Sequence, residues 1–113
     1  MEFNENKAIY LQIVEAVYEK ILSGQLSEED RLPSVREYGA DIGVNPNTVM
    51  RSYEKLTAEG IIYNKRGIGY FICEGAKDKV LASLRQAFVE NEWPAILRRA
   101  RLLGLSLSDL PSD

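Results

Sequence analysis

The 113-residue sequence contains no histidine and a single cysteine, Cys73. Without histidine there is no imidazole base for catalysis and no zinc site of the usual Cys/His type. One thiol cannot close a disulfide within the chain, so nothing indicates an oxidising compartment. Cofactor motifs and catalytic carboxylate pairs are also missing. We therefore expect a protein that is not an enzyme and that binds no cofactor or metal.

Long apolar segments are missing as well. No stretch approaches the roughly 20 residues that span a bilayer, and the opening residues, MEFNENKAIY, lack the positive charge and apolar run of a signal peptide. These absences predict a cytoplasmic protein without membrane contact. The composition, 45% hydrophobic and 27% charged, is that of a globular protein, and the length allows one domain with a short appendage.

The net charge of −3 is unevenly distributed along the chain. Residues 1–30 carry two lysines and seven acidic residues, whereas residues 31–72 carry six basic and four acidic residues. The middle segment is therefore where we expect an anion such as nucleic acid to bind. Glu28, Glu29 and Asp30 cluster in a polar connection just before it, and we expect these carboxylates only to be solvated.

Apolar side chains recur at helical spacing in the first half of the chain. Over residues 7–23 an isoleucine or valine stands at every fourth position, which predicts an amphipathic helix that ends at Gly24. A second helix is predicted from Ser34, because Ser34 and Glu37 have the spacing of a capping box. Gly39 within it costs about 1 kcal/mol relative to alanine, so we expect another element to approach closely there.

A third helix follows after a connection of only two or three residues that contains Gly43. Asn45 is its expected N-cap and Pro46 stands at the first helical position. So short a connection between helices is typical of a helix-turn-helix. Two β-prone runs then flank a basic, glycine-bearing tip at residues 64–69, which predicts a hairpin. The order predicts a mainly α fold with a small β hairpin, a winged helix-turn-helix over residues 1–75.

Residues 76–113 predict a short helical tail. One amphipathic helix is expected around Leu84 and Phe88, and Asn91 is expected to cap another in which Pro94 falls in the first turn. The apolar face exceeds what a hairpin of two helices buries on itself, so we expect a homodimer formed through these helices. The expected dimerisation residues are Leu84, Phe88, Trp93, Ile96, Leu97 and Leu103.

Polar and basic residues of the winged helix suit contact with DNA. Short amides and hydroxyls at the start of the third helix bind base edges or phosphates, and cations one and two turns further along bind guanine or the phosphate backbone. Basic residues at a wing tip suit the minor groove or flanking phosphates. The candidate DNA-contacting residues are Arg36, Asn45, Asn47, Thr48, Arg51, Lys55, Lys65, Arg66 and Gly67.

Each of these groups also has a simpler interpretation. The third helix is alternatively a capped surface helix that carries asparagine and arginine, and the wing tip is alternatively a solvated basic turn. Arg36 alternatively forms a surface salt bridge with Glu37 or Asp41.

Residues 8–72 resemble, in register and without gaps, the DNA-binding domain of GntR-type regulators. The resemblance rests on the segments RLPSVRE (31–37), NPNTVMRSYEKL (45–56) and RGIGYF (66–71). The segment NPNTV is similar to the YtrA-type subfamily, whose members have short C-terminal parts. The resemblance implies a bacterial transcription regulator that binds operator DNA as a homodimer.

By the family pattern, Arg36, Thr48, Arg66 and Gly67 fall on DNA-contacting positions. Pro46 and Met50 stand where many members carry arginine, so base contacts from those two positions are not transferred. Larger members append effector-binding domains, whereas a tail of about 38 residues is too short to enclose a ligand pocket of ~300–1,000 Å³ within one subunit.

We therefore expect a sequence-specific transcription regulator, a repressor, that binds an inverted-repeat operator as a homodimer; no small-molecule effector is assigned. The alternative is a winged-helix protein-interaction module that does not bind DNA, in keeping with the acidic total charge. Binding to random duplex DNA at low salt separates the two, because the alternative predicts none.

Overall fold

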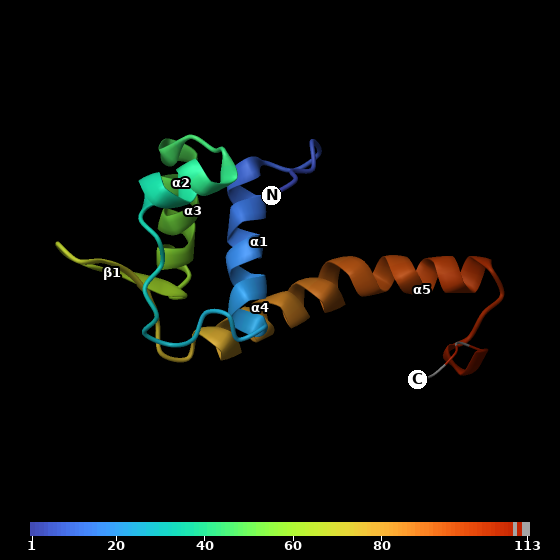
Figure 1. Ribbon diagram of the computed structural model, residues 1–113. Coiled ribbons are helices and arrows are strands. Elements are labelled where there is room, and N and C mark those ends of the chain that lie inside the picture. The colour runs from blue at the N-terminus through green and yellow to red at the C-terminus, as the bar shows by residue number, and fades with distance from the viewer. Residues whose placement is uncertain (110, 112–113) are drawn as a thin grey trace. The chain divides into compact units, whose positions relative to one another are not determined.

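The computed structural model describes residues 1–109 and 111, and the chain forms two compact units, Met1–Leu81 and Ala82–Asp113. The first unit holds three helices and a β hairpin, and the second is helical (Figure 1). In chain order the elements are α1 (Ile9–Leu22), α2 (Val35–Ile42), α3 (Pro46–Ala58), β1 (Ile62–Lys65), β2 (Gly69–Ile72), α4 (Ala76–Ala87), a π-helical turn (Phe88–Glu92), α5 (Trp93–Leu102) and a 3-10 turn (Leu107–Asp109). The predicted winged helix-turn-helix is confirmed.

The core of the first unit lies where α3 packs against both α1 and α2. The helical stripe expected over residues 7–23 is buried there from Ile13 onward, whereas Ile9 is exposed, and both strands of the hairpin pack into the same core. The residues with no more than 1% of their surface exposed are Ile13, Val17, Val49, Ser52, Tyr53, Leu56, Ile62, Ile72, Ala76 and Val80. The core includes Ala76 and Val80 at the start of α4, so the first unit extends past Gly75. The domain boundary expected at Gly75 stays a prediction.

Local hydrogen bonds shape the helix-turn-helix as the sequence predicted. The Ser34 hydroxyl accepts from the Glu37 N–H at 3.1 Å, and the Glu37 carboxylate accepts from the Ser34 N–H at 3.2 Å, which completes the capping box. Gly43 ends α2 in the left-handed region at φ 71°. Asn45 then caps α3, because its side-chain oxygen accepts from the Asn47 N–H at 2.8 Å.

The close approach expected at Gly39 is present, and the approaching element is the turn between α2 and α3. A Cβ atom added to Gly39 would lie 2.5 Å from the carbonyl oxygen of Val44. The Val44 N–H in turn donates to the Gly39 carbonyl at 2.9 Å. The absence of a side chain at Gly39 therefore lets α3 start immediately after α2.

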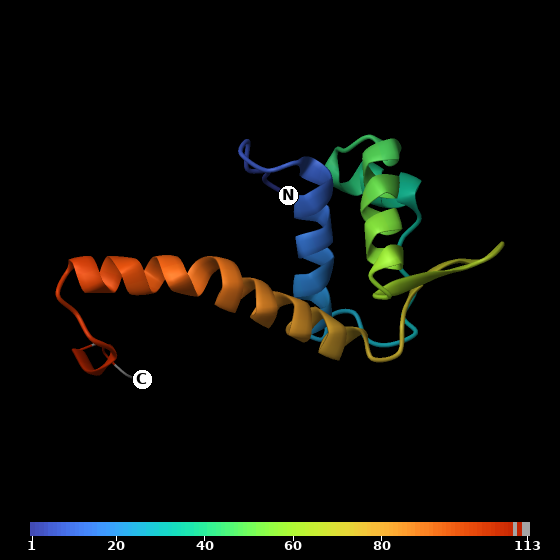
Figure 2. The same ribbon diagram turned by 180° about the vertical axis from the view of Figure 1, so that it is seen from behind.

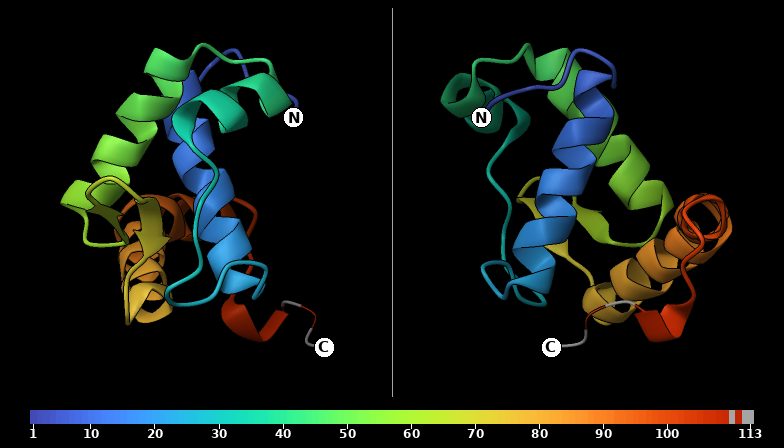
Figure 3. Two further views of the ribbon diagram at one scale, coloured as in Figure 1. Left: turned by 60° about the vertical axis from the view of Figure 1, so that its left-hand side comes forward. Right: turned by 90° about the vertical axis from the view of Figure 1, so that its right-hand side faces the viewer.

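The wing is an antiparallel hairpin in which Ile62 pairs with Ile72 and Lys65 with Gly69. Its tip turns through Gly67 at φ 78°, a conformation that favours glycine. Residue Arg31 adds an isolated bridge to β2, so the segment before Pro33 is extended, as expected. The wing therefore extends from a paired base, on the side of the first unit where α3 lies (Figures 1 and 3).

The acidic connection before the wing is more than a solvated loop, and that expectation is wrong. Glu28 accepts from the Gly75 N–H at 2.8 Å, and Glu29 accepts from the Tyr63 hydroxyl of β1. Asp30 accepts from a backbone N–H within the connection itself, at 2.8 Å. The carboxylates are exposed, yet Glu28 and Glu29 bind donors that only folding brings near them, and these two bonds attach the connection to the wing and to the residue before α4.

The tail differs from the expected pair of helices. In the second unit the helix runs without a break from Ala82 through the π-helical turn to Leu102, and Asn91 lies inside that turn instead of capping a new helix (Figure 2). The π-helical turn directly precedes Trp93 and Pro94. Because proline lacks an N–H and its ring clashes with the preceding turn, a locally wider turn lets the helix continue where the sequence suggested a new start.

Candidate nucleic-acid interface

The start of α3 presents the polar side chains that the sequence singled out. Asn47 is exposed and Thr48 is half-buried, both in the first turn. Asn45 is also exposed, but its side-chain oxygen is engaged in capping the helix, which leaves only its NH₂ group as a donor. Figure 3 shows this end of α3 beside the start of α1. The structure therefore places Asn47 and Thr48, more than Asn45, where a base edge can be reached.

Arg51, one turn further along α3, does not extend freely into solvent. Its guanidinium carbon lies 3.9 Å from the centre of the Tyr10 ring, at the start of α1. Between these two helices is a groove of about 350 Å³, lined by Ala8, Ile9, Tyr10, Asn47, Thr48 and Arg51. Tyr10 was not among the expected site residues, because no local pattern in the sequence pairs it with α3.

Lys55, the expected phosphate contact another turn along, is engaged within the chain. Its ammonium lies 3.0 Å from the Glu59 carboxylate. Glu59 also accepts from the Tyr18 hydroxyl, and burial together with this hydrogen bond raises the pKa of Tyr18 far above its ordinary value. A carboxylate thus already accompanies the Lys55 charge in the structure, and the contact of Lys55 with phosphate stays a prediction. The i,i+4 spacing of Lys55 and Glu59 was the signal that could have shown this ion pair.

Two other expected contacts have no acidic partner. Among residues 1–109 and 111, no carboxylate lies within ion-pair distance of Arg36 or Arg66, so the alternative salt bridge of Arg36 is absent. Both side chains are exposed, Arg36 at the start of α2 and Arg66 at the wing tip beside Gly67. Unbalanced, exposed cations of this kind attract phosphate.

The wing carries two further cations. Lys65 precedes the tip, with its ammonium 5.6 Å from the centre of the Phe71 ring. Arg31 was not among the candidates, yet its guanidinium lies against the tip end of β2, where a Cβ at Gly69 would be 3.0 Å from the Arg31 Nε, and Gly69 pairs with Lys65. The positive charge of the wing is therefore gathered toward its tip.

The second unit exposes large apolar side chains that include several of the expected dimerisation residues but also Leu102 and Val89, which are 86% and 60% exposed. Leu84, Phe88 and Ile96 are 37%, 42% and 45% exposed, and Leu103 is 61% exposed. Trp93 and Leu97 are half-buried, and the Trp93 ring lies 6.3 Å from that of Phe88, between centres. A pocket of about 310 Å³ along α5 is lined by Trp93, Ile96, Leu97, Ala100, Arg101, Leu105 and Ser106.

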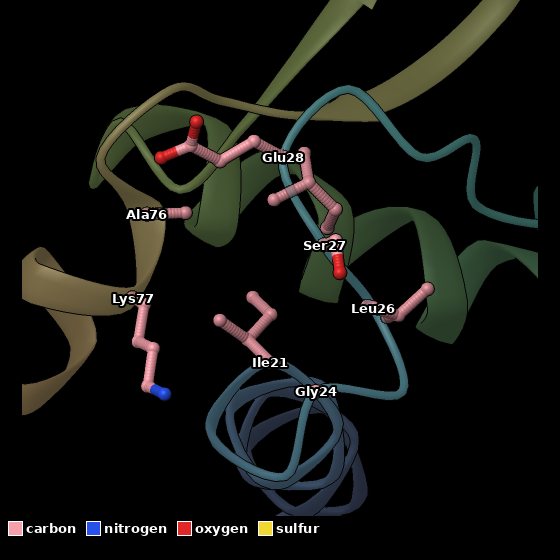
Figure 4. Close-up of a pocket in the computed structure, with 8 residues that line it drawn as sticks. Ile21, Gly24, Leu26, Ser27, Glu28, Ala76 and Lys77 are labelled. Carbon is pink, nitrogen blue, oxygen red and sulfur yellow. The ribbon is translucent and has the colours of Figure 1, made fainter.

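The first unit also contains a small hollow at the end of α1. Its volume is about 240 Å³, below the usual range for small-molecule sites of ~300–1,000 Å³. Figure 4 shows Ile21 pointing into the space, while Glu28 turns toward the start of α4, in line with its hydrogen bond to Gly75. The lining residues are Ile21, Gly24, Leu26, Ser27, Glu28, Ile72, Ala76 and Lys77.

The described part of the chain contains no helix with the length and apolarity needed to cross a bilayer. It also contains no group of three or more histidine, cysteine, aspartate or glutamate side chains placed to hold a metal ion.

A tight helix-turn-helix, a polar start of α3 and a basic wing define a winged-helix DNA-binding protein. The family described as "Bacterial regulatory proteins, gntR family" matches residues 9–72. The chain belongs to this family of DNA-binding transcription regulators, whose members are not enzymes.

The similarity to individual proteins extends beyond the DNA-binding domain. The chain is 38% identical to the HTH-type transcriptional regulator YhcF of Bacillus subtilis, over 96% of this chain and 88% of the relative. It is 36% identical to the HTH-type transcriptional repressor YtrA of the same organism, over 90% of this chain and 78% of that one. A solved GntR-family regulator from Bacteroides thetaiotaomicron matches with a TM-score of 0.78 and 46% identity, over 90% of this chain and 88% of the other.

Proposed function

We propose that this chain is a cytoplasmic transcriptional repressor that binds an inverted-repeat operator as a homodimer. The observation that carries the proposal is the arrangement of α3 and the wing. Asn47, Thr48 and Arg51 lie along the first two turns of α3, and Arg66 at the wing tip has no acidic partner among the residues that the structure describes. Repression is supported by the similarity to YtrA, which is itself described as a repressor. The mechanism is occupancy, in which the bound dimer excludes the transcription machinery from the operator.

The dimer is proposed to form through the apolar face of the second unit. The exposed side chains of Leu84, Phe88, Ile96 and Leu103 are a large unburied apolar surface for so short a segment. A two-fold partner that presents the same face would cover them through an isologous interface. Such a dimer requires inverted half-sites about 10 bp apart, or a multiple of that spacing. Footprinting of the DNA upstream of the protein's own gene should show this symmetry; one asymmetric half-site bound at full affinity would contradict it.

Changing Leu84 and Phe88 together to aspartate tests the dimer directly. Two buried, unpaired carboxylates in each subunit cannot be accommodated in an apolar interface, so we expect monomers that bind operator far more weakly. Ser83→Asp is the matched control, because it adds a carboxylate at an exposed polar position of the same helix. Light scattering at micromolar concentration measures the outcome; an unmodified protein that is monomeric there would refute the dimer.

Two alanine substitutions test which residue contacts the DNA backbone and which one reads bases. Arg66→Ala should weaken binding to operator and to random duplex DNA alike, and reduce the salt dependence by about one charge per subunit. Arg51→Ala should cost about 1–3 kcal/mol per half-site and act mainly on the operator. Equal weakening of both DNAs by Arg51→Ala would instead make Arg51 a phosphate contact, and would leave base reading to Asn47 and Thr48.

Lys20→Ala is the charge-matched control for both variants. Lys20 lies on α1 in a groove that Glu15 and Glu19 also line, and its ammonium is 5.2 Å from the centre of the Tyr38 ring. Because its surroundings are acidic, Lys20 is a poor DNA contact, and the folded variant should bind both DNAs as the unmodified protein does. Thermal melts check that the variant is folded. A loss as large as that of Arg66→Ala would show that the proposed DNA-binding face is wrong. Absence of any binding to random duplex at low salt would favour the protein-interaction module.

A further inference from the structure

The contact between Tyr10 and Arg51 joins two elements with different roles. Arg51 belongs to α3, the second helix of the helix-turn-helix, whereas Tyr10 lies in the first turn of α1, outside that motif. The 3.9 Å separation between guanidinium carbon and ring centre is well within the ~6 Å range of a cation–π contact. A residue of α1 therefore holds the cation that we expect to reach a base.

The position of Tyr10 is set by a hydrogen bond beside Arg51, and not by Arg51 itself. Ser52, the next residue of α3, is fully buried, and its hydroxyl donates to the Tyr10 carbonyl at 2.8 Å. This bond joins the backbone of α1 to α3 at the level of Arg51. The backbone that carries the Tyr10 ring is consequently held against α3 in the free protein, at the level of Arg51.

A ring face is a suitable support for a residue that must also bind DNA. In the described part of the chain no carboxylate lies within ion-pair distance of Arg51, in contrast to Lys55 with its Glu59 partner. Stacking engages the plane of the guanidinium and leaves the N–H donors along its edge available. A carboxylate partner would instead occupy those donors. Arg51 is thus restrained in direction without being neutralised.

We propose that Tyr10 is a specificity-determining positioning residue, which aims the Arg51 guanidinium at a base edge by stacking beneath it. The proposal rests on the proposed function, in which Arg51 contacts the major groove. Restraint of a long side chain before binding lowers the entropy lost on forming the contact, so the support strengthens operator binding more than random binding. Random DNA offers no matching edge for the aimed guanidinium and should gain little.

Binding measurements on Tyr10→Leu and Tyr10→Phe test this role with two DNA probes. One probe is an operator that the unmodified protein selects from a randomised duplex library, and the other is a random duplex. Leucine keeps an apolar side chain but lacks the ring face, so operator affinity should fall about two- to five-fold per subunit, the size of an exposed cation–π contact. Binding to random duplex should stay unchanged. Phenylalanine keeps the ring face and should retain operator affinity.

Combination with Arg51→Ala separates support from any independent DNA contact by Tyr10. If Tyr10 acts through Arg51, then Tyr10→Leu should have no further effect on operator binding once Arg51 is alanine. Additive losses, or unchanged or tighter operator binding by Tyr10→Leu alone, would overturn the proposal. Tighter binding would mean that Tyr10 withholds Arg51 from DNA.

NMR of the free protein distinguishes failure of this proposal from failure of the proposed function. Stacking on the ring should shift the Arg51 Hε resonance upfield in the unmodified protein and in Tyr10→Phe, but not in Tyr10→Leu. If Arg51→Ala leaves selectivity for the operator unchanged, Arg51 does not read bases and the role of Tyr10 fails, whereas the proposed function stands with base reading left to Asn47 and Thr48. If the unmodified protein selects no operator from the library, the proposed function itself fails. If Arg51→Ala abolishes selectivity while Tyr10→Leu has no effect on it, only the role of Tyr10 fails. Thermal melts confirm that each variant is folded.

Discussion

Replacement of Gly39 by alanine should destabilise the protein, although alanine is the better helix former. A Cβ at this position would lie 2.5 Å from the Val44 carbonyl oxygen, whereas ordinary contacts begin near 3.4 Å. The turn between α2 and α3 must therefore move by almost 1 Å, and the atom that must move is backbone. The Val44 N–H also donates to the Gly39 carbonyl, so the two residues cannot separate without straining that bond.

The magnitude follows from two opposing contributions. Alanine gains about 1 kcal/mol over glycine within a helix. Insertion of a methyl group into a tight contact costs about 1–3 kcal/mol, and a backbone neighbour places Gly39 at the upper end. The net expectation for Gly39→Ala is a loss of about 2 kcal/mol, which corresponds to a fall in Tm of roughly 10 °C for a domain of this size. Urea and thermal denaturation followed by circular dichroism measure both quantities.

Ala40→Gly provides the comparison in the same helix. Ala40 is exposed, so the substitution should cost about 1 kcal/mol through helix propensity alone. Since the turn leads directly into α3, folded Gly39→Ala protein should also bind operator more weakly, whereas folded Ala40→Gly protein should not. A Gly39→Ala protein that is more stable than the unmodified one by about 1 kcal/mol would refute the contact.

Three further outcomes are expected. Ser34→Ala should destabilise the protein by about 1 kcal/mol through loss of the N-cap, measured by urea denaturation. Hydrogen bonds from the Ser34 N–H and hydroxyl lower the pKa of Glu37 below its ordinary value of 4.5. The ionised carboxylate should therefore stabilise the fold above that pH, and this stabilisation should disappear as the pH falls. The difference in free energy of unfolding between the unmodified protein and Glu37→Gln should shrink over the same fall in pH. Tyr53→Phe should cost about 1–3 kcal/mol in the same assay, because it leaves the Pro33 carbonyl without the hydroxyl that donates to it at 2.7 Å; an unchanged stability would mean that water replaces that donor.

Patterns between near neighbours in the sequence predicted most of the fold. The capping box at Ser34 and Glu37, the Asn45 cap and the glycine at the end of α2 involve residues only two to four positions apart. At that distance the geometry of a helix or turn decides which groups meet, whatever the rest of the chain does. Gly39 is an intermediate case: its residue type showed that something approaches, and the structure identified the turn.

Two errors have a physical cause of the same kind. The expectation that Asn91 starts a new helix used cap and proline signals correctly, but the π-helical turn before Pro94 satisfies the same constraint without a break. The expectation that Glu28 and Glu29 are only solvated overlooked donors at Gly75 and in β1, which lie far away in the sequence. In both cases the residue type was compatible with two local structures, and contacts with the rest of the chain determined which one formed.

The sequence by itself determined the helices and the hairpin of the first unit, the turn that joins α2 to α3 and the identity of the polar residues at the start of α3. Only the tertiary structure decided which of those residues are available. It paired Lys55 with Glu59, left Arg36 and Arg66 without acidic partners among the described residues, and placed Tyr10 under Arg51. The reason is that periodicity and capping act through the local backbone, whereas the partner of a long charged side chain depends on which helices pack side by side.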